Sequence, residues 1–232
     1  MNLTPYIVKI QKWYRGSIVR LKRLPLILYS IQAHLKQQAI QFSTHTDDGR
    51  INSCMDEDHI INILIKTYGE RIKRPEKRHW YDILAYDTMY GWLPINIKTT
   101  TTVTSDNTGN LAMCVYAYTD EHLDLYKPYD NGKMSIILYD KLKSKNYNLC
   151  SKKDYYFVVL NKTNANDVIV NSVKGLSQLT PNINNLPFQV KWCNNNVFKY
   201  EHITKKITQF IHCLQKPNPS WSETFMINMR RL

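Results

Sequence analysis

Hydrophobic residues recur at helical spacing in four parts of the chain. The pattern predicts helices over residues 6–40 with an interruption at Pro25, over 56–69, over 131–144 and over 203–214. The second of these helices opens with acidic residues in its first turn and ends at a glycine, which are common features of helix termini.

Between these helices, β-branched and aromatic residues gather in short runs bounded by turn residues, a pattern that predicts strands. The expected strands cover residues 78–86, 92–99, 111–119, 154–162, 167–173 and 189–192. A turn at 87–91 joins the first two into a hairpin, while 105–110 is expected to be a turn and 179–188 an extended loop. The order of helix, three strands, helix, two strands and helix predicts a mixed α/β fold.

A loop of small polar residues, STHTDDGRINS at 43–53, is the best candidate for a boundary within the chain. We therefore expect a basic helical N-terminal segment over residues 1–45 and one larger domain over 46–232. A chain of 232 residues fits a single domain with a small appendage.

The composition indicates the kind of cellular compartment in which the protein is expected to function. No apolar run approaches the roughly 20 residues of a membrane span, and the basic N-terminus lacks the apolar core and cleavage site of a secretory signal. The five cysteines are scattered and contain no C-x-x-C pair, which argues against a disulfide framework or a zinc ribbon. We expect an intracellular, reducing compartment and no membrane partner.

Positive charge is unevenly spread along the chain, whose formal net charge is +12. Six basic and no acidic residues lie in the first 24 positions, and five more lie in 71–78, opposed there by one acid, Glu76. Such clusters suit a polyanion, and nucleic acid is favoured over a membrane surface because no amphipathic interfacial helix accompanies the second cluster. A merely solvated basic surface is the alternative.

Three polar side chains stand out on the predicted hairpin. Within the strand PINIKT, Ile95 and Ile97 point to one face, whereas Asn96 and Lys98 point to the other. Asp82 begins the preceding strand, so the three polar groups can meet at one end of the hairpin.

An aspartate, an amide and a lysine in this arrangement suit phosphodiester hydrolysis. Carboxylate oxygens hold Mg²⁺, which polarises the scissile phosphate and lowers the pKa of bound water. A lysine beside the metal orients or deprotonates that water and neutralises developing charge. The alternative is structural, with Asp82 as a turn residue and Lys98 as an exposed strand charge.

Three segments in order carry a resemblance to a known family. YDILAYDTMYGWLPINIKTT (81–100) resembles the core of PD-(D/E)xK nucleases, and specifically of type II restriction endonucleases. NIKTTTTVTSDNTGNLAMCVYAYT (96–119) and SVKGLSQLTPNINNLPFQVKW (172–192) are similar to later segments of the same enzymes. The resemblance spans about 56–215 and is closest to the restriction-type enzymes of large DNA viruses, which would place the chain in a host cytoplasm or a virion.

This resemblance implies a restriction-endonuclease-like mixed β-sheet flanked by helices, with an N-terminal helical extension. It implies site-specific cleavage of double-stranded DNA by a homodimer that uses Mg²⁺, for which Mn²⁺ can substitute. Asp82 would be the principal metal ligand, with Asn96 as a weaker neutral ligand and the Ile97 carbonyl as a further one. Glu57 would add a carboxylate, and Lys98 would activate the water.

The sequence departs from the family pattern at two positions. Tyr81 stands where the pattern has proline, which is a harmless change. Asn96 stands where aspartate or glutamate is usual; an amide oxygen can ligate a metal but brings no charge. For the helix carboxylate, Glu57 matches best and Glu70 is the alternative, while compensation of the helix dipole would explain Glu57 without any metal.

DNA reading would fall to polar residues outside the hairpin. Side chains of types that pair with base edges gather in one segment: Lys174, Ser177, Gln178, Thr180, Asn182, Asn184, Asn185 and Gln189. An exposed polar loop would have the same composition. The resemblance places Asp106 and Asn107 near the phosphate backbone, although the two most simply form a turn.

The N-terminal segment carries a separate motif. IQKWYRGSIVR fits the IQ pattern in full, with its key residues at Ile10, Gln11, Arg15, Gly16 and Arg20. A basic helix that packs on the domain, contacts DNA or helps dimerisation is favoured over one gripped by a calmodulin-like partner. Besides restriction, the sequence leaves open a nuclease-like DNA-binding protein that does not cut and a nuclease selective for DNA structure.

Overall fold

The computed structural model arranges the chain as two sheets and six helices among the residues that it describes, which are 23–38, 40–43, 49–76, 79–119, 121, 123, 129–145, 153–182, 187–199, 203–216 and 223–232. The helices are α2 (Leu26–Lys36), α3 (Gly49–Tyr68), α4 (Leu111–Thr119), α5 (Asn131–Lys143), α6 (Ile203–Leu214) and α7 (Glu223–Met229). The strands are β1 (Ile72–Lys73), β2 (Ile83–Asp87), β3 (Gly91–Thr100), β4 (Ser105–Thr108), β5 (Tyr156–Asn161), β6 (Asn164–Ser172), β7 (Thr180–Pro181) and β8 (Phe188–Lys191). Short 3-10 turns cover Gly69–Arg71, Val173–Gly175 and Trp192–Asn194.

The larger sheet has five strands in the order β1-β2-β3-β5-β6. The first three are antiparallel neighbours, β3 and β5 run parallel, and β6 returns antiparallel to β5. Because two parallel strands need a crossover, the chain leaves this sheet after β3 and forms β4, α4 and α5 before β5. The predicted mixed α/β fold is therefore confirmed.

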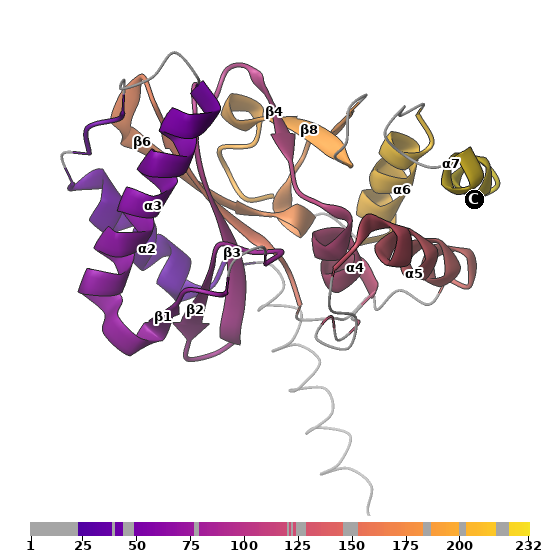
Figure 1. Cartoon of the computed structure of the whole chain (residues 1–232), viewed down its shortest axis with the longest axis horizontal. Coiled ribbons are helices and arrows are strands. Elements are labelled where there is room, and N and C mark those ends of the chain that lie inside the picture. Colours follow the sequence, from indigo (N-terminus) through magenta and orange to yellow (C-terminus); the bar gives the residue numbers. More distant parts are fainter. Residues whose placement is uncertain are drawn as a thin grey trace, which may run out of the picture.

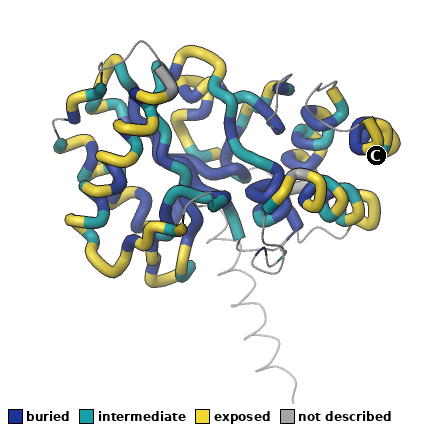
Figure 2. The backbone as a smooth tube through the Cα atoms, viewed as in Figure 1, coloured by how far each residue is buried: buried dark blue, intermediate teal, exposed yellow. Residues whose placement is uncertain are grey.

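Helices cover both faces of the five-stranded sheet, with α2 and α3 on one side and α4 to α7 on the other (Figure 1). Side chains of β5 alternate between the two faces of the sheet, so the strand contributes residues to the hydrophobic cluster on each face. Tyr156, Val158 and Leu160 pack with α2 and α3, whereas Phe157 and Val159 pack with α4 to α7. All of β5 is buried, as expected for a central strand covered on two faces (Figure 2).

A buried aspartate organises the turn of the β2–β3 hairpin. Asp87 pairs with Gly91 across the hairpin, and the φ of Gly91, 76°, lies in the region that favours glycine. The Asp87 carboxylate accepts hydrogen bonds from the N–H groups of Met89 (2.9 Å) and Tyr90 (3.2 Å). It also accepts one from the N–H of Ile27 (3.1 Å), which ties the first turn of α2 to the hairpin.

A smaller sheet, in the order β4-β8-β7, joins segments that are far apart in the sequence. β4 and β7 both pair antiparallel with β8. The prediction of a plain turn over 105–110 is therefore wrong for 105–108. The polar residues of this segment indicate a turn locally, but pairing with β8 makes them a strand.

The prediction of a strand over 111–119 is wrong, because this segment is helix α4. Eight of its nine residues are buried, so the helix has no polar face whose spacing would reveal a helical period. One residue could have indicated the start of a helix, namely Asn110. Its side-chain oxygen accepts a hydrogen bond from the N–H of Met113 (2.7 Å). An asparagine in that position is a common N-cap.

The other expected elements that fall on described residues are present with shifted ends, and β1, β7 and α7 are additions. Helix α3 begins at Gly49, about two turns before the predicted start. Residues 1–22, which include the IQ motif and five of the six residues of the first basic cluster, lie outside the described residues, so their predicted roles stay predictions. The division of the chain at residue 45 also stays a prediction, and α2 packs in the same hydrophobic cluster as α3 and the sheet.

Candidate functional site

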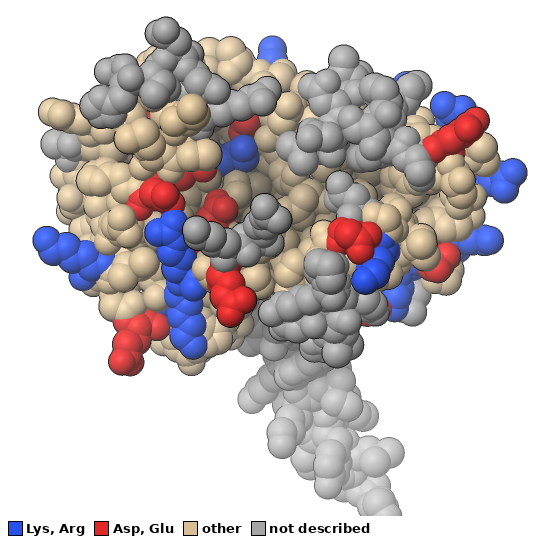
Figure 3. Space-filling view, viewed as in Figure 1, with Lys and Arg blue, Asp and Glu red and all other residues tan. Residues whose placement is uncertain are grey.

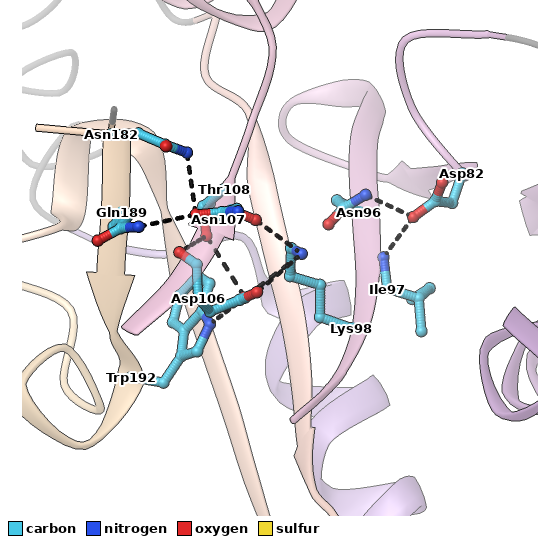
Figure 4. A network of polar contacts seen from close by, with 10 residues as sticks. All are labelled: Asp82, Asn96, Ile97, Lys98, Asp106, Asn107, Thr108, Asn182, Gln189 and Trp192. Atoms are coloured by element: carbon cyan, nitrogen blue, oxygen red, sulfur yellow. Dashed lines mark hydrogen bonds and ion pairs between the residues drawn. The ribbon is translucent and has the colours of Figure 1, made fainter. Parts of the chain in front are cut away.

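Asp82 lies immediately before β2, where the edge of β3 loses its backbone partner. Its N–H donates to the carbonyl of Ile95 (3.0 Å). Its Oδ2 accepts hydrogen bonds from the N–H of Ile97 (2.8 Å) and from Nδ2 of Asn96 (2.6 Å) (Figure 4). The carboxylate thus takes the place that the next backbone carbonyl of β2 would have occupied in the ladder.

Glu57 of α3 occupies the next place along the same edge. Its carboxylate accepts a hydrogen bond from the backbone of Thr99. In a strand, the N–H and C=O of one residue point to the same edge, and alternate residues share that edge. Ile97 and Thr99 therefore both face the edge that β2 leaves open. The carbonyl of Ile97 lies on this edge between the two carboxylates.

Both carboxylates line a cavity of about 370 Å³. The same cavity is lined by Asp58, next to Glu57 on α3, and by Arg74, which forms an ion pair with Asp58. Figure 3 shows the molecule hollowed near the middle of this face, between the α3 side and the α5–α6 side, with acidic and basic side chains on the walls. The two carboxylates are thus held against the sheet and remain open to a ligand.

Burial raises the pKa values of both carboxyl groups, and a neighbouring aspartate adds to each rise, Asp82 at Glu57 and Asp58 at Asp82. The pKa of Glu57 rises from 4.5 to about 7, chiefly because burial disfavours the charged form and next because Asp82 is close. Burial also raises the pKa of Asp82 from 3.8 to about 6, although the Ile97 hydrogen bond and the charge of Lys98 oppose the rise. A divalent cation between them would reverse both effects.

Lys98 leaves β3 on the same face as Asn96 and reaches β4 (Figure 4). Its Nζ lies 3.3 Å from Oδ2 of Asp106 and donates to the carbonyl of Asn107 at 3.2 Å. Its charge still lowers the pKa values of Glu57 and Asp82. The predicted residues therefore gather in one region, and the ammonium of Lys98 is held on the β4 side of it.

Residues expected to contact DNA form a network with one another around β4. Oδ2 of Asp106 accepts a hydrogen bond from Nε1 of Trp192 (2.8 Å). Oδ1 of Asn107 accepts from Nδ2 of Asn182 and from Nε2 of Gln189, each at 2.9 Å (Figure 4). The smaller sheet thus connects the expected reading residues to Lys98, a link that the sequence did not indicate.

Other residues expected to read bases take part in folding the loop after β6. Oδ1 of Asn195 accepts hydrogen bonds from the N–H groups of Ser177 (2.8 Å) and Gln178 (3.1 Å). The ammonium of Lys174 donates to a backbone carbonyl. Thr180 lies in β7, and its hydroxyl donates to the carbonyl of Gln189 at 3.3 Å. Two further residues lie outside the described part of the chain, Asn184 and Asn185.

The structure corrects the local interpretation of Glu57. Because α3 begins at Gly49, Glu57 lies eight residues into the helix (57 − 49), beyond the first turn in which the helix dipole acts. Dipole compensation therefore does not explain this glutamate. Glu70, the alternative carboxylate, is exposed in the 3-10 turn that follows α3.

No family model, curated protein or solved structure matches this chain. Among the residues that the structure describes, no helix has the length and apolar character needed to traverse a bilayer. Within the same residues, no group of three or more histidine, cysteine, aspartate or glutamate side chains is arranged to hold a metal ion. A metal at this site would have to combine the two carboxylates with neutral oxygens.

Neutral oxygens are available beside both carboxylates. The carbonyl of Ile97 lies between them, and Oδ1 of Asn96 is buried with no hydrogen-bond partner in the described parts of the chain. The amide nitrogen of Asn96 faces Asp82, and the oxygen points the other way (Figure 4). A half-turn of the amide presents its oxygen instead. Oxygen donors of this kind fit Mg²⁺ or Mn²⁺.

The raised pKa values predict that pH controls the effect of metal on stability. A carboxyl group whose pKa is raised by folding contributes stability at low pH that is lost as the pH rises through 6 to 7, the values for Asp82 and Glu57. Mg²⁺ binds the ionised pair and should raise the melting temperature more at pH 8 than at pH 5.5, by several degrees at roughly 2–4 °C per kcal/mol. Differential scanning fluorimetry in EDTA and in Mg²⁺ measures this difference, and an equal shift at both pH values contradicts it.

Proposed function

We propose that this protein is a Mg²⁺-dependent endonuclease that hydrolyses phosphodiester bonds in double-stranded DNA at specific sites, of the type II restriction kind within the PD-(D/E)xK nucleases. One observation carries the proposal. Two carboxylates with raised pKa values, Asp82 and Glu57, flank the Ile97 carbonyl on an open strand edge and line a cavity. The mixed sheet with helices on both faces is the architecture that the resemblance implies.

Each residue of the site has a distinct part in the proposed reaction. Asp82, Glu57 and the Ile97 carbonyl would hold the metal, and Asn96 would add its amide oxygen. When bound, the metal supplies polarisation of the phosphate and a bound water of lowered pKa. Lys98 neutralises charge that develops on the phosphate and orients the attacking water. Arg74, which lines the same cavity, is positioned to contact a neighbouring phosphate oxygen.

The choice of DNA as substrate rests on charge and on the residues around β4. The net charge of +12 favours a polyanion. The side chains of Asn107, Asn182 and Gln189 are of the kinds that pair with base edges, and they lie in one network with Lys98. A homodimer belongs to the proposal because duplex target sites are usually twofold symmetric.

Digestion of unmodified plasmid DNA tests the proposed activity. Discrete fragments are expected in Mg²⁺ or Mn²⁺ and none in EDTA, and sequencing the fragment ends would give the site and the stagger of the cut. Absence of cleavage in both metals would remove the enzymatic claim. Cutting confined to branched or nicked DNA would favour a structure-selective nuclease instead.

Two adjacent carboxylates on α3 provide a matched pair of variants. Glu57 and Asp58 both line the cavity, but Glu57 bonds to the sheet edge whereas Asp58 pairs with Arg74. Glu57→Gln is expected to slow cleavage by roughly a hundredfold because a charged oxygen ligand is lost. Asp58→Asn should remain within a few-fold of the unaltered chain. Plasmid cleavage rates measure both, and equal effects of the two variants would contradict the role of Glu57.

A protein that binds DNA without cutting it is the second candidate, and Asn96 favours it. The side chain at this position brings no charge. Its amide nitrogen donates to Asp82, so the nitrogen and not the oxygen lies on the side of the Asp82 carboxylate. Such a protein would retain duplex DNA in a gel-shift assay while leaving plasmid intact in both metals. Binding together with cleavage would exclude it.

A further inference from the structure

A second cavity, of about 230 Å³, lies beside the candidate site and has aromatic walls. Its lining includes Leu84 and Pro94 of the hairpin and four aromatic side chains, Trp80, Tyr81, Trp92 and Tyr116. Two pairs of these rings are in contact, since the centroid of Trp80 lies 5.0 Å from that of Tyr81 and 4.8 Å from that of Tyr116. The cavity therefore offers aromatic faces and edges to a ligand.

The aromatic cavity is one step along the hairpin from Asp82. Side chains two residues apart in a strand share a face, so Leu84 lies on the face of Asp82, about 7 Å further along. Leu84 pairs with Pro94 in the register of the hairpin. Tyr81 lines both this cavity and the one that contains the two carboxylates. A group in the aromatic cavity is thus within the reach of a single nucleotide from a phosphate at Asp82.

Charge at the rim decides which kind of ligand fits the aromatic cavity. Aromatic cages also bind organic cations. Here Lys153 Nζ already lies 5.4 Å from the ring centroid of Tyr116, and Lys73 Nζ lies 4.2 Å from that of Trp92. Glu121 also lines the cavity, but its carboxylate is paired with Lys141. The two ammonium groups beside Tyr116 and Trp92 therefore disfavour a further cation and favour a neutral ring that carries phosphate. The volume, below the roughly 300–1,000 Å³ of drug-sized ligand sites, suits one planar ring system.

We propose that the aromatic cavity binds one nucleobase of the DNA strand whose phosphate lies at Asp82 and Glu57. The inference rests on the proposed function for its substrate and adds that one base leaves the stack when the strand is bound. Aromatic side chains stack on any base, so this contact adds affinity and position more than sequence readout. Trp80, which lines the cavity, also carries a buried Nε1 with no hydrogen-bond partner in the described residues.

Binding of short single-stranded DNA to the full chain in EDTA tests this inference without cleavage. The probe is a fluorescein-labelled oligodeoxynucleotide of about six residues in which each position in turn is made abasic, and binding is read by fluorescence anisotropy. Loss of the base at one position should weaken binding roughly tenfold, since stacking of a base on an aromatic side chain corresponds to about five- to 150-fold. Loss at the other positions should matter less than about twofold.

Three variants locate the effect in the aromatic cavity. Trp92→Leu removes one wall, and Leu84→Trp fills the floor, so both should abolish the difference between positions. Tyr86→Leu is the matched control, because Tyr86 lies opposite Trp92 in the hairpin and is 38% exposed compared with 36% for Trp92, yet it does not line the cavity. Thermal melting of each variant confirms that it is folded.

The results separate this inference from the proposed function. A single-position effect that disappears in Trp92→Leu and Leu84→Trp and persists in Tyr86→Leu supports it. Equal losses at every position, no binding of the probe, or a position effect that survives filling of the cavity would overturn it. Plasmid cleavage without a position effect would remove this inference alone, whereas a position effect without cleavage would remove the enzymatic proposal alone.

Discussion

Replacing Asp82 with asparagine is expected to slow DNA cleavage by at least about a thousandfold, which corresponds to roughly 4 kcal/mol in activation free energy. The variant keeps the size of the side chain and an oxygen that can accept the Ile97 hydrogen bond of 2.8 Å. It removes the negative charge of one of the two carboxylates beside the Ile97 carbonyl, so a metal ion is held less tightly and polarises the phosphate less. Single-turnover cleavage of plasmid at saturating Mg²⁺ measures the rate.

The other aspartate of the hairpin provides the control. Asp87, at the opposite end of β2, is 2% exposed and bonds to the turn and to α2. Asp87→Asn should lower the melting temperature while the folded protein cleaves within about tenfold of the unaltered rate. The role given to Asp82 does not survive if Asp82→Asn cleaves normally, or if its loss of activity follows only from unfolding.

The hairpin could be predicted from the sequence because its determinants are local. Alternation in PINIKT fixed which side chains share a face, and the turn at 87–91 set which residues of the two strands meet. Asp82 and Asn96, predicted to converge, are hydrogen-bonded at 2.6 Å. The proximity of Glu57 depended on family resemblance, since its place on α3 says nothing locally about the sheet edge that it contacts.

The network around Lys98 could not be predicted because it depends on pairings between distant segments. β4 exists only through its ladder with β8, so Asp106 has a turn-like local sequence and a strand conformation in the fold. Trp192, which donates to Asp106, follows β8 and is 86 residues away along the chain. The prediction for the segment of α4 failed for a different reason. A helix that is buried on all sides has no polar positions to mark its helical period.

Asn96 changes the electrostatic balance of the site. A third carboxylate at this position would add repulsion to a pair whose pKa values already stand at about 6 and 7. The amide instead donates to Asp82 and so stabilises that carboxylate when no cation is bound. We therefore expect the metal-free fold to be more stable, and the metal to be held less tightly, than in a site with three acids.

Replacing Lys98 with methionine should slow cleavage by about a thousandfold, at the upper end of the roughly 10²–10³ found for the loss of one group that stabilises charge in the transition state. The ammonium group is lost, whereas much of the apolar stem is kept. Because the charge of Lys98 lowers the pKa values of Asp82 and Glu57, its removal should also shift the rise of activity with pH to higher pH. Cleavage rates measured from pH 5.5 to 9 test both effects.

Lys162 is the matched control for the loss of a partly buried lysine. Its side chain is 24% exposed, compared with 20% for Lys98, and its Nζ bonds to Ser53 of α3 at 2.9 Å. Lys162→Met should lower the melting temperature and leave the pH profile in place. A Lys98→Met protein that cleaves normally, or a Lys162→Met protein with the same shifted profile, would contradict the role of Lys98, because charge beside the two carboxylates is what distinguishes these lysines.

Asp106→Asn should keep the Lys98 ammonium but loosen its position, with a loss of about tenfold in kcat and little change in KM.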